Sequence, residues 1–386
     1  MKKKVLAFVM AATMVFSLAA CGSSSSGSDS SSNSDASAPA ESGDDVQTFK
    51  LGSIGPLTGD AAIYGQAVVN GAKLATEEIN ASDSKIKFEF QGEDDEADGE
   101  KSVNAYNTLM AWGMQVLVGP TTTGASMAVA DACSNDRTFM LTPSASAVDV
   151  TAGKDNVFQV CFTDPNQGLA SADYIAENAL ATKIGVIYDS SDAYSSGIYA
   201  KFKTEAESKG LEIVTAEAFT SDNKSDLSTQ VAKCQEAGAE LVFLPIYYTP
   251  ASLILNQAKT MGYAPTFFAC DGMDGILDLE GFDTSLAEGL MLLTPFAADA
   301  QDEKTQAFVS AYVAAYGETP NQFSADAYDV IYSMYQAVLE AGITGDMDAS
   351  EICEQLKTCA LCKSERRLCE SKGCGRKYLL YGVRAS

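Results

Sequence analysis

Short apolar runs alternate with helix-like segments along most of this chain, and this alternation limits the folds open to it. In residues 65–80, for example, Val68, Ala72 and Ala75 recur at helical spacing. Such repetition is typical of parallel sheets that are covered by helices on both faces. Because the strand-like runs are too many for one sheet, we expect an α/β fold with two doubly wound parallel-sheet lobes joined by a hinge. The strand-like runs occupy residues 49–54, 85–90, 116–118, 138–141, 157–160, 183–188, 211–219, 241–244 and 265–269.

Small hydroxyl residues follow two of these runs. Residues 119–124 (GPTTTG) come after the run at 116–118, and residues 142–147 (TPSASA) come after the run at 138–141. In a parallel sheet, ligands bind beyond the carboxyl ends of the strands, where following helices offer unpaired N–H groups. Hydroxyls at such turns suit a small anion, such as a carboxylate. The alternative is that Thr123 and Ser146 only cap helices.

The chain begins with features of an export signal. Three lysines precede an apolar segment, which ends in Leu18-Ala19-Ala20-Cys21. This ending resembles a bacterial lipobox, in which the cysteine is lipid-modified, so we interpret residues 1–21 as a lipoprotein signal peptide with Cys21 as its lipidation site. Residues 22–47 are rich in Ser, Gly and Asp and predict a flexible tether. We therefore expect the protein on the extracellular face of the cell membrane, held there by a lipid anchor only.

Composition excludes several functions. The chain has 52 acidic and 26 basic residues, a net charge of −26 and no histidine. A surface so acidic is unsuited to nucleic acid, and the absence of histidine excludes Ser-His-Asp and Cys-His catalysis and His-ligated zinc. The acidic run at residues 93–100 lacks the spacing of a calcium loop, and we interpret it as a solvated helix entrance. We expect no cofactor and no metal.

The last 29 residues differ from the rest of the chain. Residues 358–386 are basic and contain Cys359, Cys362, Cys369 and Cys374, whereas the preceding chain is acidic. Four thiolates at this spacing could hold zinc. The second cysteine pair lacks the usual two-residue spacing, however, and a zinc knob of this kind is unusual on an exported protein. We therefore interpret this atypical Cys-rich tail as disordered, or as the end of a shifted reading frame.

A set of short motifs resembles a known family. In chain order they are GSIGPLTG at residues 52–59, YG at 64–65, VGP at 118–120, TPSAS at 142–146, YSSG at 194–197 and DG at 271–272. Their order and spacing are similar to those of the branched-chain amino acid (Leu/Ile/Val) binding proteins of ABC importers, which have the type I periplasmic binding fold. The resemblance extends from about Thr48 to about Lys357. It implies a first lobe of residues 48–160 plus 297–357 and a second lobe of residues 161–296, with a third crossing between lobes beyond Lys357 that we do not recognise.

The resemblance also implies how the ligand, an amino acid in its zwitterionic form, would be bound. In the family, hydroxyl and N–H groups at the positions of Thr123 and Ser146 bind the ligand's carboxylate. The ammonium is bound by the carbonyl at Ser144, the hydroxyl at Ser146 and an acid at Asp271. A buried zwitterion needs both charges paired, because an unpaired buried charge is costly. The alternative for Asp271 is an ordinary turn residue in Asp-Gly.

Aromatic residues complete the implied site. Side chains at the positions of Tyr64, Tyr194 and Tyr248 close over the ligand in the family, and Phe323 matches a further wall residue. Tyr247 could replace Tyr248, because the local alignment slips by one residue. Packing at the edge of the core is the alternative for these tyrosines. Since Thr121 and Thr122 stand where branched-chain binders look more apolar, a small or polar amino acid fits as well as leucine.

The function implied is that of an extracellular solute-binding lipoprotein, a monomer and not an enzyme. It would capture an amino acid between two lobes by hinge closure and deliver it to an ABC permease. Two alternatives stay open at this point. One is a ligand-sensing lipoprotein of the same fold, and the other is an exported enzyme that uses Asp94, Asp95 or Asp271 as a general acid or base.

Overall fold

The computed structural model describes residues 46–358 and 379–382 of the chain. The signal peptide, Cys21, most of the tether and the four cysteines of the tail lie outside these residues, so what the sequence predicts for them stays a prediction. Within the described part, none of the helices is both long and apolar enough to cross a membrane.

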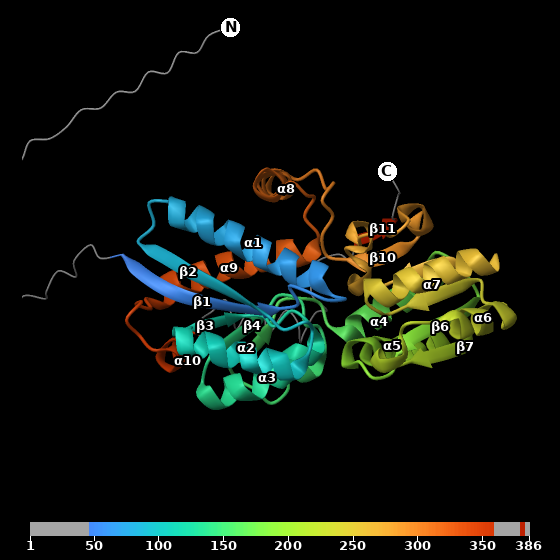
Figure 1. The fold of residues 1–386 in the computed structure, drawn as a ribbon, viewed down its shortest axis with the longest axis horizontal. Coiled ribbons are helices and arrows are strands. Elements are labelled where there is room, and N and C mark those ends of the chain that lie inside the picture. Colours follow the sequence, from blue (N-terminus) through green and yellow to red (C-terminus); the bar gives the residue numbers. More distant parts are fainter. Residues whose placement is uncertain (1–45, 359–378, 383–386) are drawn as a thin grey trace, which may run out of the picture. The chain divides into compact units, whose positions relative to one another are not determined.

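The first lobe is built on a five-stranded parallel sheet in the order β2-β1-β3-β4-β5 (Figure 1). Helices α1, α9 and α10 cover one face, α2 and α3 cover the other, and α8 packs against α1. The strands are β1 (Gln47–Gly55), β2 (Ile86–Asp94), β3 (Val116–Val118), β4 (Phe139–Thr142) and β5 (Val157–Gln159). The helices are α1 (Ala62–Ala81), α2 (Gly99–Trp112), α3 (Thr123–Asp136), α8 (Glu303–Tyr316), α9 (Gln322–Ala341) and α10 (Ala349–Leu356).

The second lobe repeats this plan. Its sheet has the order β11-β10-β9-β8-β6-β7, in which β6 to β10 are parallel and β11 is antiparallel to β10. Helices α4 and α5 cover one face and α6 and α7 the other. The strands are β6 (Lys183–Asp189), β7 (Glu212–Phe219), β8 (Leu241–Leu244), β9 (Thr266–Ala269), β10 (Met291–Thr294) and β11 (Leu379–Gly382); the helices are α4 (Asp164–Glu177), α5 (Ala193–Ser208), α6 (Ser228–Glu236) and α7 (Tyr248–Met261). Two parallel-sheet α/β lobes confirm the predicted fold class.

Burial on both faces explains why the strands read as continuous apolar runs. In β3 every residue is buried, with Val116 and Val118 packed on the α1 side and Leu117 on the α2 and α3 side. The helices between strands begin and end at local signals. Asp98 caps the start of α2 by accepting hydrogen bonds from Glu100 N and Lys101 N, and Gly113, at φ 91°, ends that helix in the left-handed region.

The chain passes between the sheets three times. The first passage follows β5 at residues 160–163 and the second follows β10 at residues 295–302. The third lies between α10, which packs on the first sheet, and β11, which pairs with β10 in the second. The sequence analysis interpreted residues 358–386 as a disordered tail or as the end of a shifted reading frame; within this segment, residues 379–382 form β11 and pair with the edge of β10.

The acidic run at residues 93–100 is not a solvated helix entrance throughout. Asp94 ends β2 and accepts hydrogen bonds from Leu57 N at 2.8 Å and Thr58 Oγ1 at 2.5 Å, which fixes the loop after β1. Asp95 is fully buried and accepts a hydrogen bond from Ser102 Oγ at 3.0 Å. Burial raises the pKa of Asp95 to about 6. The run therefore organises the turn that leads into α1.

Candidate functional site

A small buried cavity lies between the lobes, beyond the carboxyl ends of β3 and β4 in the first sheet and of β6, β8 and β9 in the second. Such a position, next to the points where strand order reverses, is where doubly wound sheets bind ligands. Eight of the nine residues that the sequence predicts for the site line this cavity. The lining residues are Tyr64, Thr121, Thr122, Thr123, Ser144, Ser146, Tyr194, Tyr247, Asp271, Gly272 and Phe323.

Tyr248 is the predicted residue that does not line the cavity. Its ring packs edge-on against Tyr64, with 4.8 Å between ring centroids, and its hydroxyl accepts a hydrogen bond from Ile63 N at 3.2 Å. Tyr247, the alternative considered for this position, does line the cavity and stacks on Tyr194 at 5.1 Å. The difference arises because Tyr247 precedes α7 while Tyr248 is its first residue and faces the neighbouring lobe.

Helix α3 points its N-terminus at the cavity. Thr122 occupies the N-cap position and Thr123 is the first helical residue, and neither side chain caps the helix. The first N–H groups of any α-helix have no acceptor within the helix. Because no side chain caps α3, these groups can donate to a ligand in the cavity. Ser146 precedes a single 3₁₀ turn at Val148–Val150, which it does not cap either. The interpretation of Thr123 and Ser146 as simple helix caps is therefore wrong.

Two hydroxyls that line the cavity donate hydrogen bonds to nearby backbone carbonyls. Ser144 Oγ donates a hydrogen bond to the Thr121 carbonyl at 2.7 Å, and Thr121 Oγ1 donates to the Ile54 carbonyl at 3.4 Å. These bonds tie the turn after β4 to the turn after β3 and the end of β1. They hold the Ser144 main chain, whose carbonyl is the group that the family resemblance implicates, at the edge of the cavity.

Asp271 is the acid of the cavity. It is only 4% exposed, and its Oδ1 accepts a hydrogen bond from Tyr194 Oη at 2.6 Å. Burial raises the pKa of Asp271 to about 6, against the opposing effect of hydrogen bonds from Tyr194 and Gln167. Gln322, which sequence reasoning missed, donates from Nε2 to the Asp271 carbonyl at 2.9 Å and so ties the first lobe to this turn.

A second buried acid, Asp164, was also missed. It lies in the first turn of α4, and its backbone N–H donates a hydrogen bond to the Ser146 carbonyl at 3.0 Å. Both carboxyl oxygens are buried, and the hydroxyl of Ser146 faces them. Burial raises the pKa of Asp164 well above its usual range. In the sequence, Asp164 stands before Pro165 and looks like an ordinary helix start, so nothing there signals its burial.

The lobes are in contact around the cavity. Tyr64 Oη donates a hydrogen bond to the Gly272 carbonyl and accepts one from Tyr248 N at 3.2 Å. At the outer edge, Thr249 Oγ1 donates to the Asp60 carbonyl at 2.6 Å. The cavity measures about 20 Å³, which is room for about one water molecule. An amino acid can therefore enter only when the lobes move apart.

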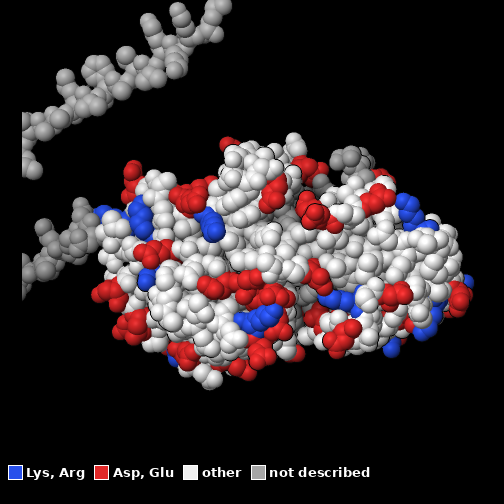
Figure 2. All heavy atoms as spheres, viewed as in Figure 1, with Lys and Arg blue, Asp and Glu red and all other residues white. Residues whose placement is uncertain are grey.

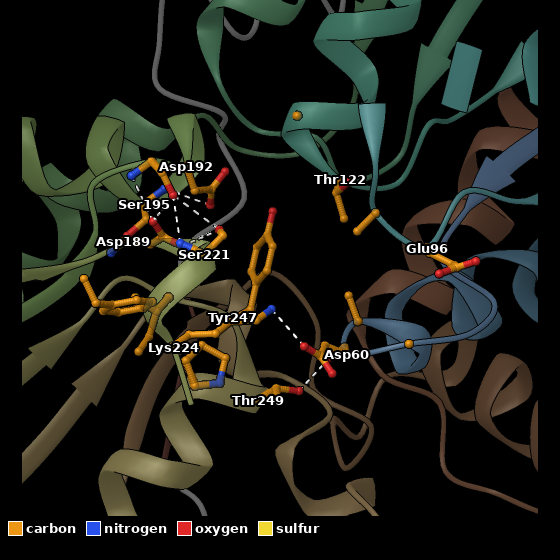
Figure 3. Close-up of a pocket in the computed structure, with 18 residues that line it drawn as sticks. Asp60, Glu96, Thr122, Asp189, Asp192, Ser195, Ser221, Lys224, Tyr247 and Thr249 are labelled. Carbon is orange, nitrogen blue, oxygen red and sulfur yellow. Dashed lines mark hydrogen bonds and ion pairs between the residues drawn. The ribbon is translucent and has the colours of Figure 1, made fainter. Parts of the chain in front are cut away.

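A wider cleft of about 480 Å³ lies outside this cavity (Figure 3). Thr122 and Tyr247 line both spaces and so separate the cleft from the cavity. Acidic side chains are spread over the face of the molecule seen in Figure 2, and the cleft shares this character. Its charged lining residues are Asp60, Glu96, Asp189 and Asp192 with Lys224, which pairs with Asp60 at 2.8 Å.

Comparisons with known proteins agree on one family. The family model described as periplasmic binding protein matches residues 48–362. Among curated proteins, the chain is similar to the Leu/Ile/Val-binding protein homolog 3 of Brucella melitensis, with 30% identity over 78% of this chain and 81% of the relative. It is also similar to the leucine-, isoleucine-, valine-, threonine- and alanine-binding protein of Pseudomonas aeruginosa, with 27% identity over 81% of this chain and 83% of the relative.

Solved structures give the same result. The leucine-binding protein of Thermotoga maritima has a TM-score of 0.72 and 26% identity, over 80% of this chain and 87% of that protein. The branched-chain amino acid transporter substrate-binding protein of Streptococcus pneumoniae, solved with isoleucine, has a TM-score of 0.73 and 28% identity, over 80% of this chain and 88% of that protein.

Proposed function

Because the chain belongs to the periplasmic binding protein family, we propose that it is a lipid-anchored substrate-binding protein that captures a free amino acid between its lobes and delivers it to an ABC importer. The relatives are named for amino acid binding and not for catalysis. An exported enzyme is thus the less suitable interpretation.

One observation carries the proposal: the buried cavity combines an acid on the second lobe with a helix N-terminus and several hydroxyls on the first. The α-carboxylate of the ligand would accept hydrogen bonds from Thr123 Oγ1 and the first-turn N–H groups of α3. The α-ammonium would donate to Asp271 and to the Ser144 carbonyl. Ser146 Oγ lies on the same wall and serves either group. Both charges of the amino acid would then be paired, which lowers the free-energy cost of burying them.

The charge balance of the cavity supports a zwitterion over a simple acid. Asp271 is the one ionisable acid among the lining residues, and none of them is Lys or Arg. A ligand with only a carboxylate would add a second negative charge beside Asp271. A ligand that also carries an ammonium would leave the closed site with one negative charge, on the carboxylate that accepts a hydrogen bond from Tyr194.

Thermal unfolding of the chain without residues 1–21, screened against the free amino acids, tests this function. A ligand at 100 times its dissociation constant stabilises the folded state by about 2.7 kcal/mol, which corresponds to a rise in Tm of roughly 5 °C. Asp271→Asn should abolish the rise, whereas Asp83→Asn, in the exposed turn that follows α1, should keep it. If no amino acid raises the Tm of a cooperatively unfolding protein, the proposal is wrong.

Anchoring and delivery need a test in cells. Cys21→Ala should release the protein from the membrane fraction into the medium and lower uptake of the amino acid found in the screen. Uptake that persists in a deletion strain, despite binding in vitro, would instead favour a sensor of the same fold.

A further inference from the structure

One hydroxyl of the cavity remains unassigned after the groups for a zwitterion are counted. The first lobe contributes five serine and threonine hydroxyls besides the paired hydroxyl of Tyr64, and of these five Thr121 and Ser144 bind nearby carbonyls. The proposed function uses Thr123 and Ser146 for the α-carboxylate and α-ammonium. Thr122 Oγ1 is left, and it is buried without a hydrogen-bond partner among the described residues. Buried polar groups are nearly always hydrogen-bonded. A hydrogen-bond partner for this hydroxyl would therefore come from the bound ligand.

A second hydroxyl faces the same space from the other lobe. Tyr247 Oη makes no hydrogen bond within the described part of the chain, and the tyrosine's contacts are with the rings of Tyr64 and Tyr194. In Figure 3 the ring of Tyr247 stands in the middle of the cleft, between Thr122 and the group formed by Asp192 and Ser195. Thr122 and Tyr247 therefore offer two hydroxyls from opposite lobes at the boundary of the cavity.

The cavity offers little to an aliphatic side chain. Phe323 is the one lining side chain without a polar atom, and its ring is packed against Tyr64 with 4.4 Å between centroids. A leucine or valine side chain in this space would leave the Thr122 hydroxyl buried against carbon. Loss of the partner of a buried hydroxyl is what makes polar sites reject apolar ligands of the same shape.

We propose that the ligand is a small amino acid whose uncharged side chain carries a hydrogen-bonding group, and that Thr122 Oγ1 pairs with that group when the lobes close. This inference rests on the proposed function and specifies its ligand. Hydroxyls both donate and accept hydrogen bonds, so Thr122 Oγ1 suits either a hydroxyl or an amide on the ligand.

Isosteric ligand pairs separate hydrogen bonding from size. Threonine and valine have the same shape, as do asparagine and leucine, so isothermal titration calorimetry with these four amino acids measures the effect of the polar group. We expect threonine to bind at least about tenfold more tightly than valine. Asparagine should likewise bind more tightly than leucine. Equal or tighter binding of valine and leucine would overturn the inference while leaving the proposed function intact. Failure of every amino acid to bind would instead contradict the function itself.

Two variants locate the effect. Thr122→Val keeps the shape of the side chain and removes no cap, since Thr122 makes no side-chain cap bond; it should lose most of the threonine preference and leave valine binding within about threefold. Thr123→Val should weaken threonine and valine equally, because the carboxylate is common to both. If Thr122→Val weakens both ligands equally, Thr122 does not contact the side chain and the inference is wrong. Thermal unfolding of each ligand-free variant checks that it is folded.

Discussion

The Tyr194 hydroxyl donates to one oxygen of Asp271 at 2.6 Å and at the same time accepts a hydrogen bond from Gly272 N at 2.9 Å. A single phenol thus fixes both the carboxylate and the main chain of the turn after β9. Because one carboxylate oxygen is occupied in this way, the other is left for a ligand. Tyr194 comes from α5 and Asp271 from the turn after β9, so the acid is oriented wholly within the second lobe.

Ligand affinity should fall at acid pH. Binding of an ammonium requires ionised Asp271, and burial raises the pKa of that carboxyl to about 6 in the ligand-free protein. The ionised fraction, and with it the apparent affinity, is therefore nearly full at pH 8 and about tenfold lower at pH 5. Titration calorimetry between pH 5 and 8 measures this directly. An affinity that stays constant over this range would contradict the ammonium assignment of Asp271.

The ligand-free protein should become more heat-stable on mild acidification. Burial raises the pKa of both Asp95 and Asp271 to about 6, compared with about 3.9 in an unfolded chain. Between these values the folded state binds more protons, so stability is gained as pH falls through 6 and is lost again as pH rises. Differential scanning calorimetry should give a Tm several degrees higher at pH 5 than at pH 8.

Asp95→Asn isolates one of these groups. The neutral amide keeps an oxygen for Ala97 N and removes the buried charge. We expect the variant to gain stability at pH 8 and to show a shallower dependence of Tm on pH. A loss of Tm that is the same at pH 5 and pH 8 would mean that the carboxyl of Asp95 is not responsible for the pH dependence.

Tyr64→Phe should weaken lobe closure. The hydroxyl donates to the Gly272 carbonyl and accepts from Tyr248 N, so its loss leaves two groups of the second lobe unpaired only when the lobes are closed. At about 1 kcal/mol for each bond, ligand affinity should fall by roughly 10–30-fold. Small-angle X-ray scattering should also record a larger radius of gyration for the variant with ligand.

Tyr332→Phe is the matched control for this substitution. Its hydroxyl donates to Glu78 Oε2 at 2.8 Å between two helices of the first lobe, away from the second. Affinity and radius of gyration should stay unchanged in this variant. Equal losses in both variants would show that Tyr64 acts through general stability and not through the contact between lobes.

The Lys224–Asp60 ion pair should contribute little. It joins the lobes at 2.8 Å, but the two side chains are 36% and 62% exposed, and solvent screens pairs of this kind. Lys224→Gln should change ligand affinity by less than about threefold, and affinity should depend only weakly on salt. A tenfold loss would contradict this expectation and show that the ion pair contributes to holding the lobes together.

Much of the cavity could be predicted because its residues follow strands. Polar turns after apolar runs drew attention to Thr123 and Ser146, and the order of motifs added the aromatic residues. Asp164 could not be found this way. Its position near the cavity depends on the packing of α4 against α5, where Gly197 lets the helix backbone approach the carboxyl. That contact joins residues far apart in sequence, and no local pattern encodes it.

Helices α6 and α7 were not predicted for a related reason. The segment after β8 reads as an extended aromatic turn, and α7 begins within it at Tyr248. Pro250 lies in the first turn of this helix, where the missing N–H costs nothing. Sequence analysis left Tyr247 and Tyr248 as alternatives, and the helix that turns Tyr248 towards Tyr64 and leaves Tyr247 at the cavity became evident only in the fold.

The interruption of the first lobe by the second sets an order in which the two lobes can be completed. When the chain is made from its N-terminal end, the segment from α4 to β10 is completed in one piece and supplies almost all of its sheet. The sheet formed by β1 to β5 must wait for α9, which packs along α1 and covers the same face. Until that helix is released, the apolar face of the first sheet is open to solvent and to other chains. The lobe that is synthesised first is thus completed after its neighbour.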